Sequence, residues 1–377
     1  MPHTGWPRCG PAGTAPYDAA GPAGSRPPGV PDRPGRTSGA TGTEGVRRVE
    51  DDLDVHVPTR VRVRVPSKVN LFLAVRGVRD DGYHELVTVL QTLGLHDTVT
   101  ARLEGPAAQH PAARRSMRLA FTQDAGCGVP SDERNLAVRA ARSLMAAAGL
   151  GPPGGPDGPS ARSETNGPMT RLHLDKRIPV AAGMAGGSAD AAATLLALDE
   201  LWGAGFDRDQ LRELAAELGA DVPFCVTGGT ALATGTGTAT AQVLVRGTYH
   251  WVVGVSHAPL ATPEVYRAFD EVCAPSDVEP DAVLQALRTG DAEALGAAVH
   301  NDLEHAAFHL RPELEAKRDA FLAAGALGAL VSGSGPTVVG LAPTAQEAAR
   351  LARAVEDDFD RVEVTVSPAG GPEVARD

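Results

Sequence analysis

A run of small residues that could bind phosphate separates a predicted strand from a predicted helix. The run extends from Pro179 to Ala189, contains three glycines and reads Pro-Val-Ala-Ala-Gly-Met-Ala-Gly-Gly-Ser-Ala. Where such a run opens a helix, the backbone N–H groups and the positive end of the helix dipole attract a phosphate group. The residues fit neither the Walker A pattern nor the G-x-G-x-x-G fingerprint. The alternative is a tight turn whose glycines serve only packing.

Two charged residues elsewhere in the chain stand in apolar surroundings. Lys68 interrupts an apolar strand pattern, and Asp221 follows a helix that we expect to end at Gly219. A buried ammonium and a buried carboxylate each need a partner, and each is the simplest partner for the other. Such a pair keeps Asp221 ionised, as a base that removes a hydroxyl proton requires. The alternatives are a turn or cap residue for Asp221 and an edge-strand lysine with a solvated ammonium for Lys68.

The predicted strands and helices do not alternate regularly along the chain. These elements must position the residues described above. Period-two apolar patterns predict strands at residues 61–65, 69–73, 86–93, 98–103, 171–176, 231–234, 241–245, 251–255, 331–341 and 361–366. Helical spacing and capping residues predict helices at residues 132–148, 191–202, 207–218, 282–287, 292–299 and 312–324, and a last one after Thr344. Ser131 or Asp132 is the expected N-cap of the first helix. We therefore predict an α+β fold of two domains, with mixed or antiparallel sheets, packed helices and an active site in the cleft between the domains.

Glycine and proline mark the predicted domain boundaries. The first 50 residues hold 10 Gly and 9 Pro and no apolar period, so residues 1–58 are predicted to be a disordered leader. A targeting peptide or a start assigned too far upstream are the alternatives for this leader. Residues 151–168 hold 5 Gly and 5 Pro and are predicted to be a flexible insertion. The two domains are predicted at residues 59–232 and 233–377.

The composition excludes several classes of protein. A net charge of −12 disfavours binding to nucleic acid or to an acidic membrane surface, because like charges repel. No apolar window approaches the length of a membrane span. The four cysteines form no C-x-x-C pair, which predicts a reducing, cytoplasmic location and no cysteine metal cluster. The sequence gives no indication of the oligomeric state.

Several short motifs together resemble the superfamily of small-molecule kinases that includes galactokinase, homoserine kinase and mevalonate kinase. Residues 66–73, 179–192 and 331–336 are similar to its first, central and third motifs. Within the superfamily, residues 66–73, 81–85, 176–189 and 219–223 are most similar to the family of 4-diphosphocytidyl-2-C-methyl-D-erythritol kinases of the non-mevalonate isoprenoid pathway. The resemblance spans residues 60–368. It implies ATP-dependent phosphorylation of the 2-hydroxyl of that cytidine-diphospho sugar alcohol, with residues 59–232 as the catalytic, ATP-binding domain.

The resemblance also implies roles for individual residues in phosphoryl transfer. Asp221 would be the base, and Lys68 would orient it and stabilise the transferring phosphoryl group. Ser188 is the nearest hydroxyl for the phosphate or for Mg²⁺, whereas Asp190 is more simply explained as a helix cap. The residues expected to surround the ATP phosphates are Pro179, Val180, Ala181, Ala182, Gly183, Met184, Ala185, Gly186, Gly187, Ser188 and Ala189.

Further residues match family positions near the two ends of the substrates. Tyr83 and His84 match the pair that recognises the cytosine ring, and Tyr266 falls where an aromatic residue closes the other face of that ring. Asn70 and Thr262 complete the predicted substrate-binding set. Asn135 and Lys176 match positions near the adenine of ATP, and their alternatives are a helix N-cap and an ordinary surface charge.

Two other functions remain possible from the sequence. A kinase of the same superfamily could act on homoserine or mevalonate, but such a substrate has no need of the Tyr83–His84 pair. A nucleotide-binding regulator without catalysis needs the phosphate loop but neither Lys68 nor Asp221. The sequence departs from many relatives at Ala181, Ala182 and Ala185, where glycines are usual.

Overall fold

A computed structural model describes residues 58–104, 118–123, 128–150, 169–256 and 259–377. The predicted leader, apart from its last residue, and the predicted insertion at residues 151–168 lie outside the described residues.

An eight-stranded sheet is built around two long antiparallel strands, β1 (Arg60–Val78) and β2 (His84–Glu104). The strand order is β12-β1-β2-β4-β3, while β5 also pairs with β2, β6 pairs with β5 and β8 pairs with β1. The β1–β8 and β3–β4 pairs are parallel and the others antiparallel, so the sheet is mixed as predicted. The other strands are β3 (Arg118–Gln123), β4 (Met169–Asp175), β5 (Thr230–Gly235), β6 (Ala239–Gln242), β8 (His300–Asn301) and β12 (Glu373–Arg376).

Strand β1 continues through the residues that were expected to interrupt it. Its pairing with β2 shifts register between Pro66 and Ser67 and again between Asn70 and Phe72. Such bulges re-aim side chains without ending the strand. All residues from Val65 to Val75 are buried, so polar side chains within this stretch must find partners inside the protein.

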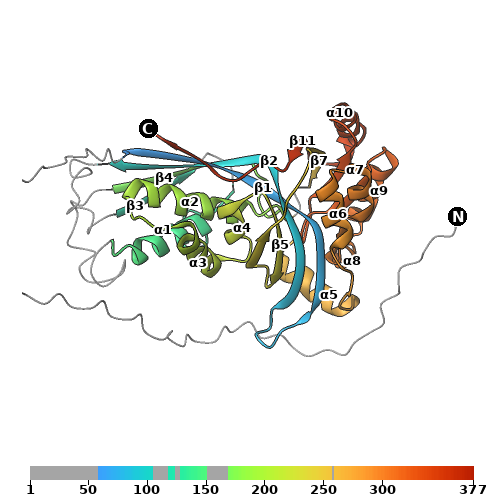
Figure 1. The fold of residues 1–377 in the computed structure, drawn as a ribbon, viewed down its shortest axis with the longest axis horizontal. Coiled ribbons are helices and arrows are strands. Elements are labelled where there is room, and N and C mark those ends of the chain that lie inside the picture. Colours follow the sequence, from blue (N-terminus) through green and yellow to red (C-terminus); the bar gives the residue numbers. More distant parts are fainter. Residues whose placement is uncertain (1–57, 105–117, 124–127, 151–168, 257–258) are drawn as a thin grey trace, which may run out of the picture. The chain divides into compact units, whose positions relative to one another are not determined.

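Four helices cover one face of this sheet: α1 (Leu136–Ala147), α2 (Gly186–Trp202), α3 (Arg208–Leu218) and α4 (Val222–Thr227) (Figure 1). Helix α2 contacts β1, β2 and the three other helices, which explains why it is apolar on nearly every side. The helix predicted at residues 191–202 ends before the C-cap Gly203, and the helix predicted at residues 207–218 has Asp207 as its N-cap, so both boundaries are confirmed. The predicted N-cap of α1 was wrong, because Asn135 rather than Ser131 or Asp132 accepts from the first turn.

A second, four-stranded antiparallel sheet has the order β11-β7-β10-β9. Its strands are β7 (Tyr249–Val255), β9 (Gly328–Val331), β10 (Val338–Ala342) and β11 (Arg361–Ser367). The helices of this part are α5 (Thr262–Val272), α6 (Asp281–Thr289), α7 (Ala292–Ala298), α8 (Leu303–Leu310), α9 (Glu313–Ala323) and α10 (Ala345–Ala354), followed by a 3₁₀ turn at Glu356–Asp358. The α+β class is confirmed. Helices α4, α5 and α8 and strands β3, β8 and β12 were not predicted.

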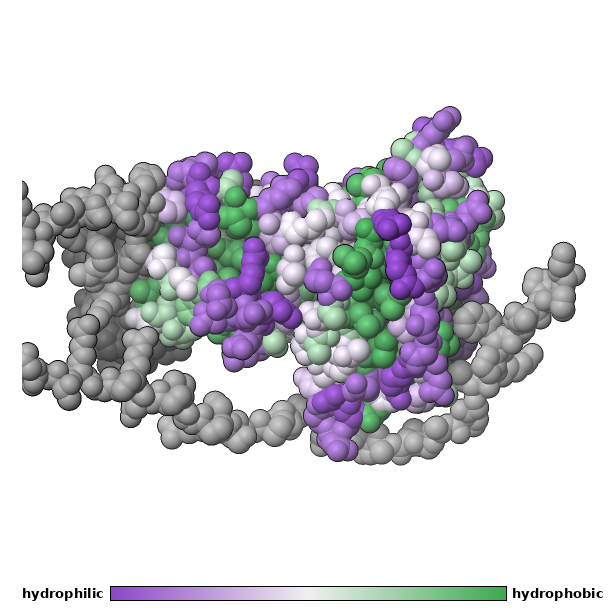
Figure 2. Space-filling model, viewed as in Figure 1, coloured by the Kyte–Doolittle hydropathy of each residue, from purple (hydrophilic) through white to green (hydrophobic). Residues whose placement is uncertain are grey.

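The core is built mainly from Val, Leu and Ala, as the low aromatic content predicts. The two buried tryptophans satisfy their indole N–H groups: Trp202 donates to Thr170 Oγ1 at 2.9 Å and Trp251 donates to Ser367 Oγ at 2.8 Å. By contrast, the end of the β1–β2 hairpin is hydrophilic (Figure 2). Within the described part of the chain, no helix combines the length and the apolar character needed to cross a membrane.

Two alanines of the 179–189 run adopt a backbone conformation that favours glycine. Ala181 has a φ of 52° and Ala185 a φ of 56°, and Ala185 is the N-cap of α2. In this left-handed region the Cβ atom crowds the backbone, at a cost of about 1–2 kcal/mol per residue. The two alanines therefore strain the loop that they belong to.

We predict that Ala185→Gly raises the free energy of unfolding by about 1 kcal/mol, because glycine adopts this φ without the clash. Urea denaturation followed by circular dichroism measures the change. The matched control is Ala193→Gly in the interior of α2, which should lower the stability by about 1 kcal/mol. A loss of stability in both variants would show that the left-handed conformation at residue 185 is not strained.

Candidate active site

The two charged residues that the sequence singled out lie next to each other. Lys68 Nζ on β1 lies 3.5 Å from Oδ2 of Asp221, the N-cap residue of α4. The lysine side chain is 5% exposed and the aspartate side chain 36% exposed. The ammonium is thus enclosed while the carboxylate remains open to a ligand. A substrate hydroxyl can therefore approach Asp221 without displacing Lys68 from its pocket.

The ammonium of Lys68 has a second fixed partner. It donates to Asn70 Oδ1 at 2.6 Å, and the backbone N–H of Lys68 donates to Met184 O at 3.3 Å. Asn70, also buried, was predicted to bind substrate, and the structure places its amide against Lys68. The first motif is therefore bonded directly to the 179–189 run.

The turn between β9 and β10 closes the site from another direction. A Cβ atom on Gly183 would lie 1.9 Å from Ser332 O, and Ser332 Oγ donates to Gly183 O at 3.2 Å. A Cβ atom on Gly333 would lie 3.4 Å from Lys68 Nζ and 3.3 Å from Asn70 Oδ1. Because only glycine permits these close approaches, the three motifs at residues 66–73, 179–189 and 331–336 meet around one ammonium group.

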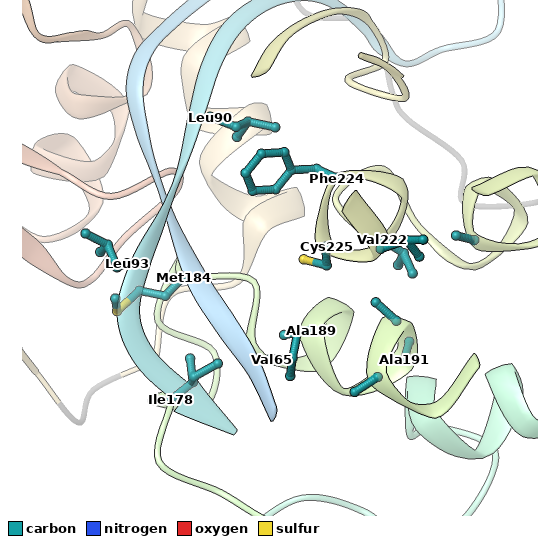
Figure 3. Packing of buried hydrophobic residues seen from close by; sticks show 14 of the residues in the cluster. Val65, Leu90, Leu93, Ile178, Met184, Ala189, Ala191, Val222, Phe224 and Cys225 are labelled. Carbon is teal, nitrogen blue, oxygen red and sulfur yellow. The ribbon is translucent and has the colours of Figure 1, made fainter. Parts of the chain in front are cut away.

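The 179–189 run is held by side chains that enter the core. Ala182 and Met184 are buried, and Figure 3 shows Met184 and Ile178 near Leu93 of β2. Ala181, which precedes them, is exposed, and Gly183 between them is half-buried. The first N–H groups of an α-helix have no intrahelical acceptor, and the N-cap Ala185 has no side chain that could accept from them. These N–H groups, with the half-buried Ser188, are suited to an anionic ligand.

Lys176 is a buried residue, so its interpretation as a surface charge was wrong. Its side chain is 4% exposed, and its ammonium donates to Asp97 and to Asp190 Oδ2, the latter at 2.7 Å. Asp190 is not a helix cap either, because α2 already begins at Gly186. Burial, reinforced by the charge of Asp97, raises the pKa of Asp190 to about 7 against the attraction of Lys176.

Asp97 is a site residue that sequence analysis missed. Its Oδ1 accepts from the backbone N–H groups of Arg177 at 2.6 Å and Ile178 at 2.8 Å, just before the loop begins. Together, Asp97, Lys176 and Asp190 tie the end of β4 to the first turns of α2. The signal was present in the sequence, since Asp97 has the same parity in β2 as the buried Val99 and Ala101.

Three of the residues predicted to recognise a base gather near α5. The rings of His84 and Tyr266 are stacked with centroids 4.7 Å apart, and His84 Nε2 lies 2.8 Å from Asp270 Oδ1. Tyr83 is exposed in the turn before β2. One face of Tyr266 therefore lies against His84, and the idea that Tyr266 closes the second face of a cytosine ring stays a prediction.

Two other predicted residues lie close to the glycine-rich segments. Thr262 Oγ1 lies 2.9 Å from Ser334 Oγ, in the turn that closes the site. Asn135 is the N-cap of α1, accepting from Ala137 N at 2.9 Å and donating to Pro130 O at 2.8 Å. The N-cap interpretation of Asn135 is thus confirmed, and a contact with adenine remains a prediction.

Comparison with known proteins gives consistent matches. Residues 135–229 match the family described as GHMP kinases N terminal domain, and residues 283–361 match GHMP kinases C terminal. The 4-diphosphocytidyl-2-C-methyl-D-erythritol kinase of Salinispora tropica is 47% identical over 313 residues, which cover 81% of this chain and 90% of that protein.

Solved structures give the same result for the fold. A crystal structure of 4-(cytidine 5'-diphospho)-2C-methyl-D-erythritol kinase matches with a TM-score of 0.62 and 36% identity, covering 82% of this chain and 99% of that chain. Homoserine kinase from Cytophaga hutchinsonii matches with a TM-score of 0.61 and 19% identity, covering 84% and 98% of the two chains. At that identity the second match shows a shared fold alone.

We predict that Lys176→Met lowers the free energy of unfolding by about 3–5 kcal/mol, because it leaves two buried carboxylates without their cation. Urea denaturation measures the loss. Arg177→Met, which changes the exposed neighbour, is the control and should stay within about 0.5 kcal/mol of the parent chain. Equal stability of the two variants would contradict the role assigned to the Asp97–Lys176–Asp190 cluster.

Proposed function

Because the chain belongs to the family of 4-diphosphocytidyl-2-C-methyl-D-erythritol kinases, we propose that it transfers the γ-phosphoryl group of ATP to the 2-hydroxyl of 4-diphosphocytidyl-2-C-methyl-D-erythritol. The reaction belongs to the non-mevalonate pathway to isoprenoid precursors. The observation that carries the proposal is the pair of Lys68 and Asp221, 3.5 Å apart beside the start of α2.

In this proposal, Asp221 accepts the proton of the substrate hydroxyl as that oxygen attacks the γ-phosphorus. Its carboxylate is open enough to reach a hydroxyl and is oriented by an enclosed cation. Lys68 lies beside the carboxylate and offers positive charge to the transferring group. Phosphoryl transfer depends chiefly on positioning and charge stabilisation, which these two side chains supply.

The backbone of residues 179–189 is proposed to hold the ATP phosphates. The N–H groups of the first turn of α2 and the hydroxyl of Ser188 provide donors where a Walker-type lysine is missing from the loop. The position of the loop is set from one side by Asp97 and from the other by Ser332. A loop fixed in this way loses little further conformational entropy when the nucleotide binds.

The donor set fits a magnesium ion that is bound mostly by nucleotide and water. Among the described residues, no three acidic, histidine or cysteine side chains cluster as a complete metal site. Mg²⁺ usually takes one or two protein ligands together with substrate phosphates, and Ser188 is the residue we propose to contribute. When bound, the ion neutralises charge on the phosphates.

The stacked His84 and Tyr266, with the exposed Tyr83, are proposed to bind the cytosine base, and Asn70 and Thr262 are proposed to belong to the substrate-binding set. We also propose that residues 59–232 and 233–377 form two domains with the site between them. The two family matches fall one in each part, and both parts contribute residues to the site. A cytoplasmic location is proposed because the four cysteines of the sequence are scattered and form no C-x-x-C pair.

An assay that couples ADP release to NADH oxidation tests the substrate. The purified chain is expected to turn over 4-diphosphocytidyl-2-C-methyl-D-erythritol with Mg²⁺-ATP, and neither homoserine nor mevalonate. Turnover of homoserine or mevalonate without the cytidine substrate would reject the substrate assignment but keep the kinase. ATP binding without turnover of any of the three would favour a nucleotide-binding regulator.

Within the same assay, Asp221→Asn is expected to lower kcat by at least about a thousandfold, because the amide cannot take the hydroxyl proton. Binding of ATP, followed by calorimetry, should remain within about threefold, since Asp221 lies outside the phosphate loop. Asp209→Asn in α3 is the matched control: its side chain is exposed, and kcat should not change. Normal turnover by the Asp221 variant would remove this residue from the mechanism.

A further inference from the structure

One buried threonine next to the site has no role in the proposed mechanism. Thr88 lies on β2, opposite Leu73 of β1, and is 3% exposed. Its hydroxyl donates to Phe72 O at 2.6 Å and accepts from Asn70 Nδ2 at 2.8 Å. The contact occurs where the β1–β2 ladder shifts register between Asn70 and Phe72.

The hydroxyl of Thr88 constrains the amide of Asn70. A hydroxyl has a single proton, and Thr88 gives it to the carbonyl of Phe72. Toward Asn70 the hydroxyl can therefore act only as an acceptor, so the NH₂ group of Asn70 must face Thr88. The carbonyl oxygen of the same amide then has to face Lys68, as observed at 2.6 Å.

The orientation of this amide in turn fixes the ammonium of Lys68. If the amide were reversed, its NH₂ group would point at the lysine, and two donors would oppose each other in a buried pocket. The ammonium has little room to move away, because the backbone of Gly333 closes the pocket. Its distance to Asp221 would then change, although neither catalytic side chain had been altered.

We propose that Thr88 is a positioning residue of the phosphoryl-transfer reaction: its hydroxyl sets the orientation of the Asn70 amide, and through that amide the place of the Lys68 ammonium beside Asp221. The inference rests on the proposed function and extends it by one residue that touches neither substrate nor Asp221. Because the hydrogen bond that Asn70 accepts comes from a charged group, misplacing this ammonium should be measurable in kcat.

The test compares Thr88→Val, which keeps the shape and removes the hydroxyl, with Thr88→Ser, which restores it. We expect kcat to fall about tenfold to a hundredfold in the valine variant, with the KM for ATP within about twofold. The serine variant should stay within about threefold of the parent kcat. A purely structural role would lower the melting temperature of the valine variant and leave kcat unchanged.

Thr230→Val is a matched control for the loss of a buried hydroxyl. Thr230 is also 3% exposed, and its Oγ1 accepts from the amide of Gln91 at 2.8 Å, yet it has no link to Lys68. It should lose stability as Thr88→Val does and keep its kcat within about twofold. If Thr230→Val loses as much kcat as Thr88→Val, or Thr88→Val loses none, the proposal is overturned.

A double-mutant cycle with Asn70→Ala tests whether Thr88 acts through Asn70. Adding Thr88→Val to Asn70→Ala should lower kcat no further, whereas an additive loss would refute the relay. If Thr88→Val does not fold, Thr88→Cys, with its weak donor and acceptor, takes its place under the same criteria. The substrate is first established with the parent chain. If the parent chain phosphorylates none of the alcohols, that result counts against the proposed function. If it phosphorylates one of them, the variants are compared on that alcohol.

Discussion

Enclosure of one ammonium group is the constraint around which this fold is organised. Lys68 sits in a strand that is buried on both sides, and a cation in such a place must be balanced and hydrogen-bonded. Asp221 supplies the charge and Asn70 an acceptor, while Gly183 and Gly333 let two other chain segments close over the group. The partners come from β1, from the start of α4, from the loop before α2 and from the turn between β9 and β10. Placing a single lysine therefore brings four distant parts of the chain together.

A second buried cation, Lys176, has a different task. Its two carboxylate partners are themselves buried, whereas the partner of Lys68 is open to solvent. The Lys176 cluster fixes the backbone, because it joins the end of β4 to α2. Gly186 leaves just enough space above the ammonium of Lys176. The Lys68–Asp221 pair leaves the carboxylate of Asp221 available for chemistry. The same pairing of Lys with Asp thus serves structure in one place and reactivity in the other, and the difference is the exposure of the carboxylate.

Much of this could be predicted from the sequence, and the failures have physical causes. Lys68 and Asp221 were predicted to form a pair because burying either charge alone costs free energy. That prediction depends on the sequence alone. Lys176 and Asp190 were misjudged because they lie just before and within the first turns of a helix, where charges are usually solvated. Asp97 was overlooked although it lies in the inward register of β2, since a lone polar residue barely alters a period-two pattern. Helix α5 begins at Thr262-Pro263 without a side-chain cap, so its start carried little signal.

Loop strain and loop anchoring are connected in the 179–189 run. Ala181 and Ala185 hold left-handed conformations that a free chain of alanines would leave, so something must hold them there. The anchors are the buried side chains of Ala182 and Met184, which lie between the two strained positions, and the contact of Gly183 with Ser332. Because these anchors hold the middle of the run, the loop has few conformations left to it. The methyl groups of Ala181 and Ala185 then cost stability but also reduce the freedom that a nucleotide would otherwise have to remove on binding.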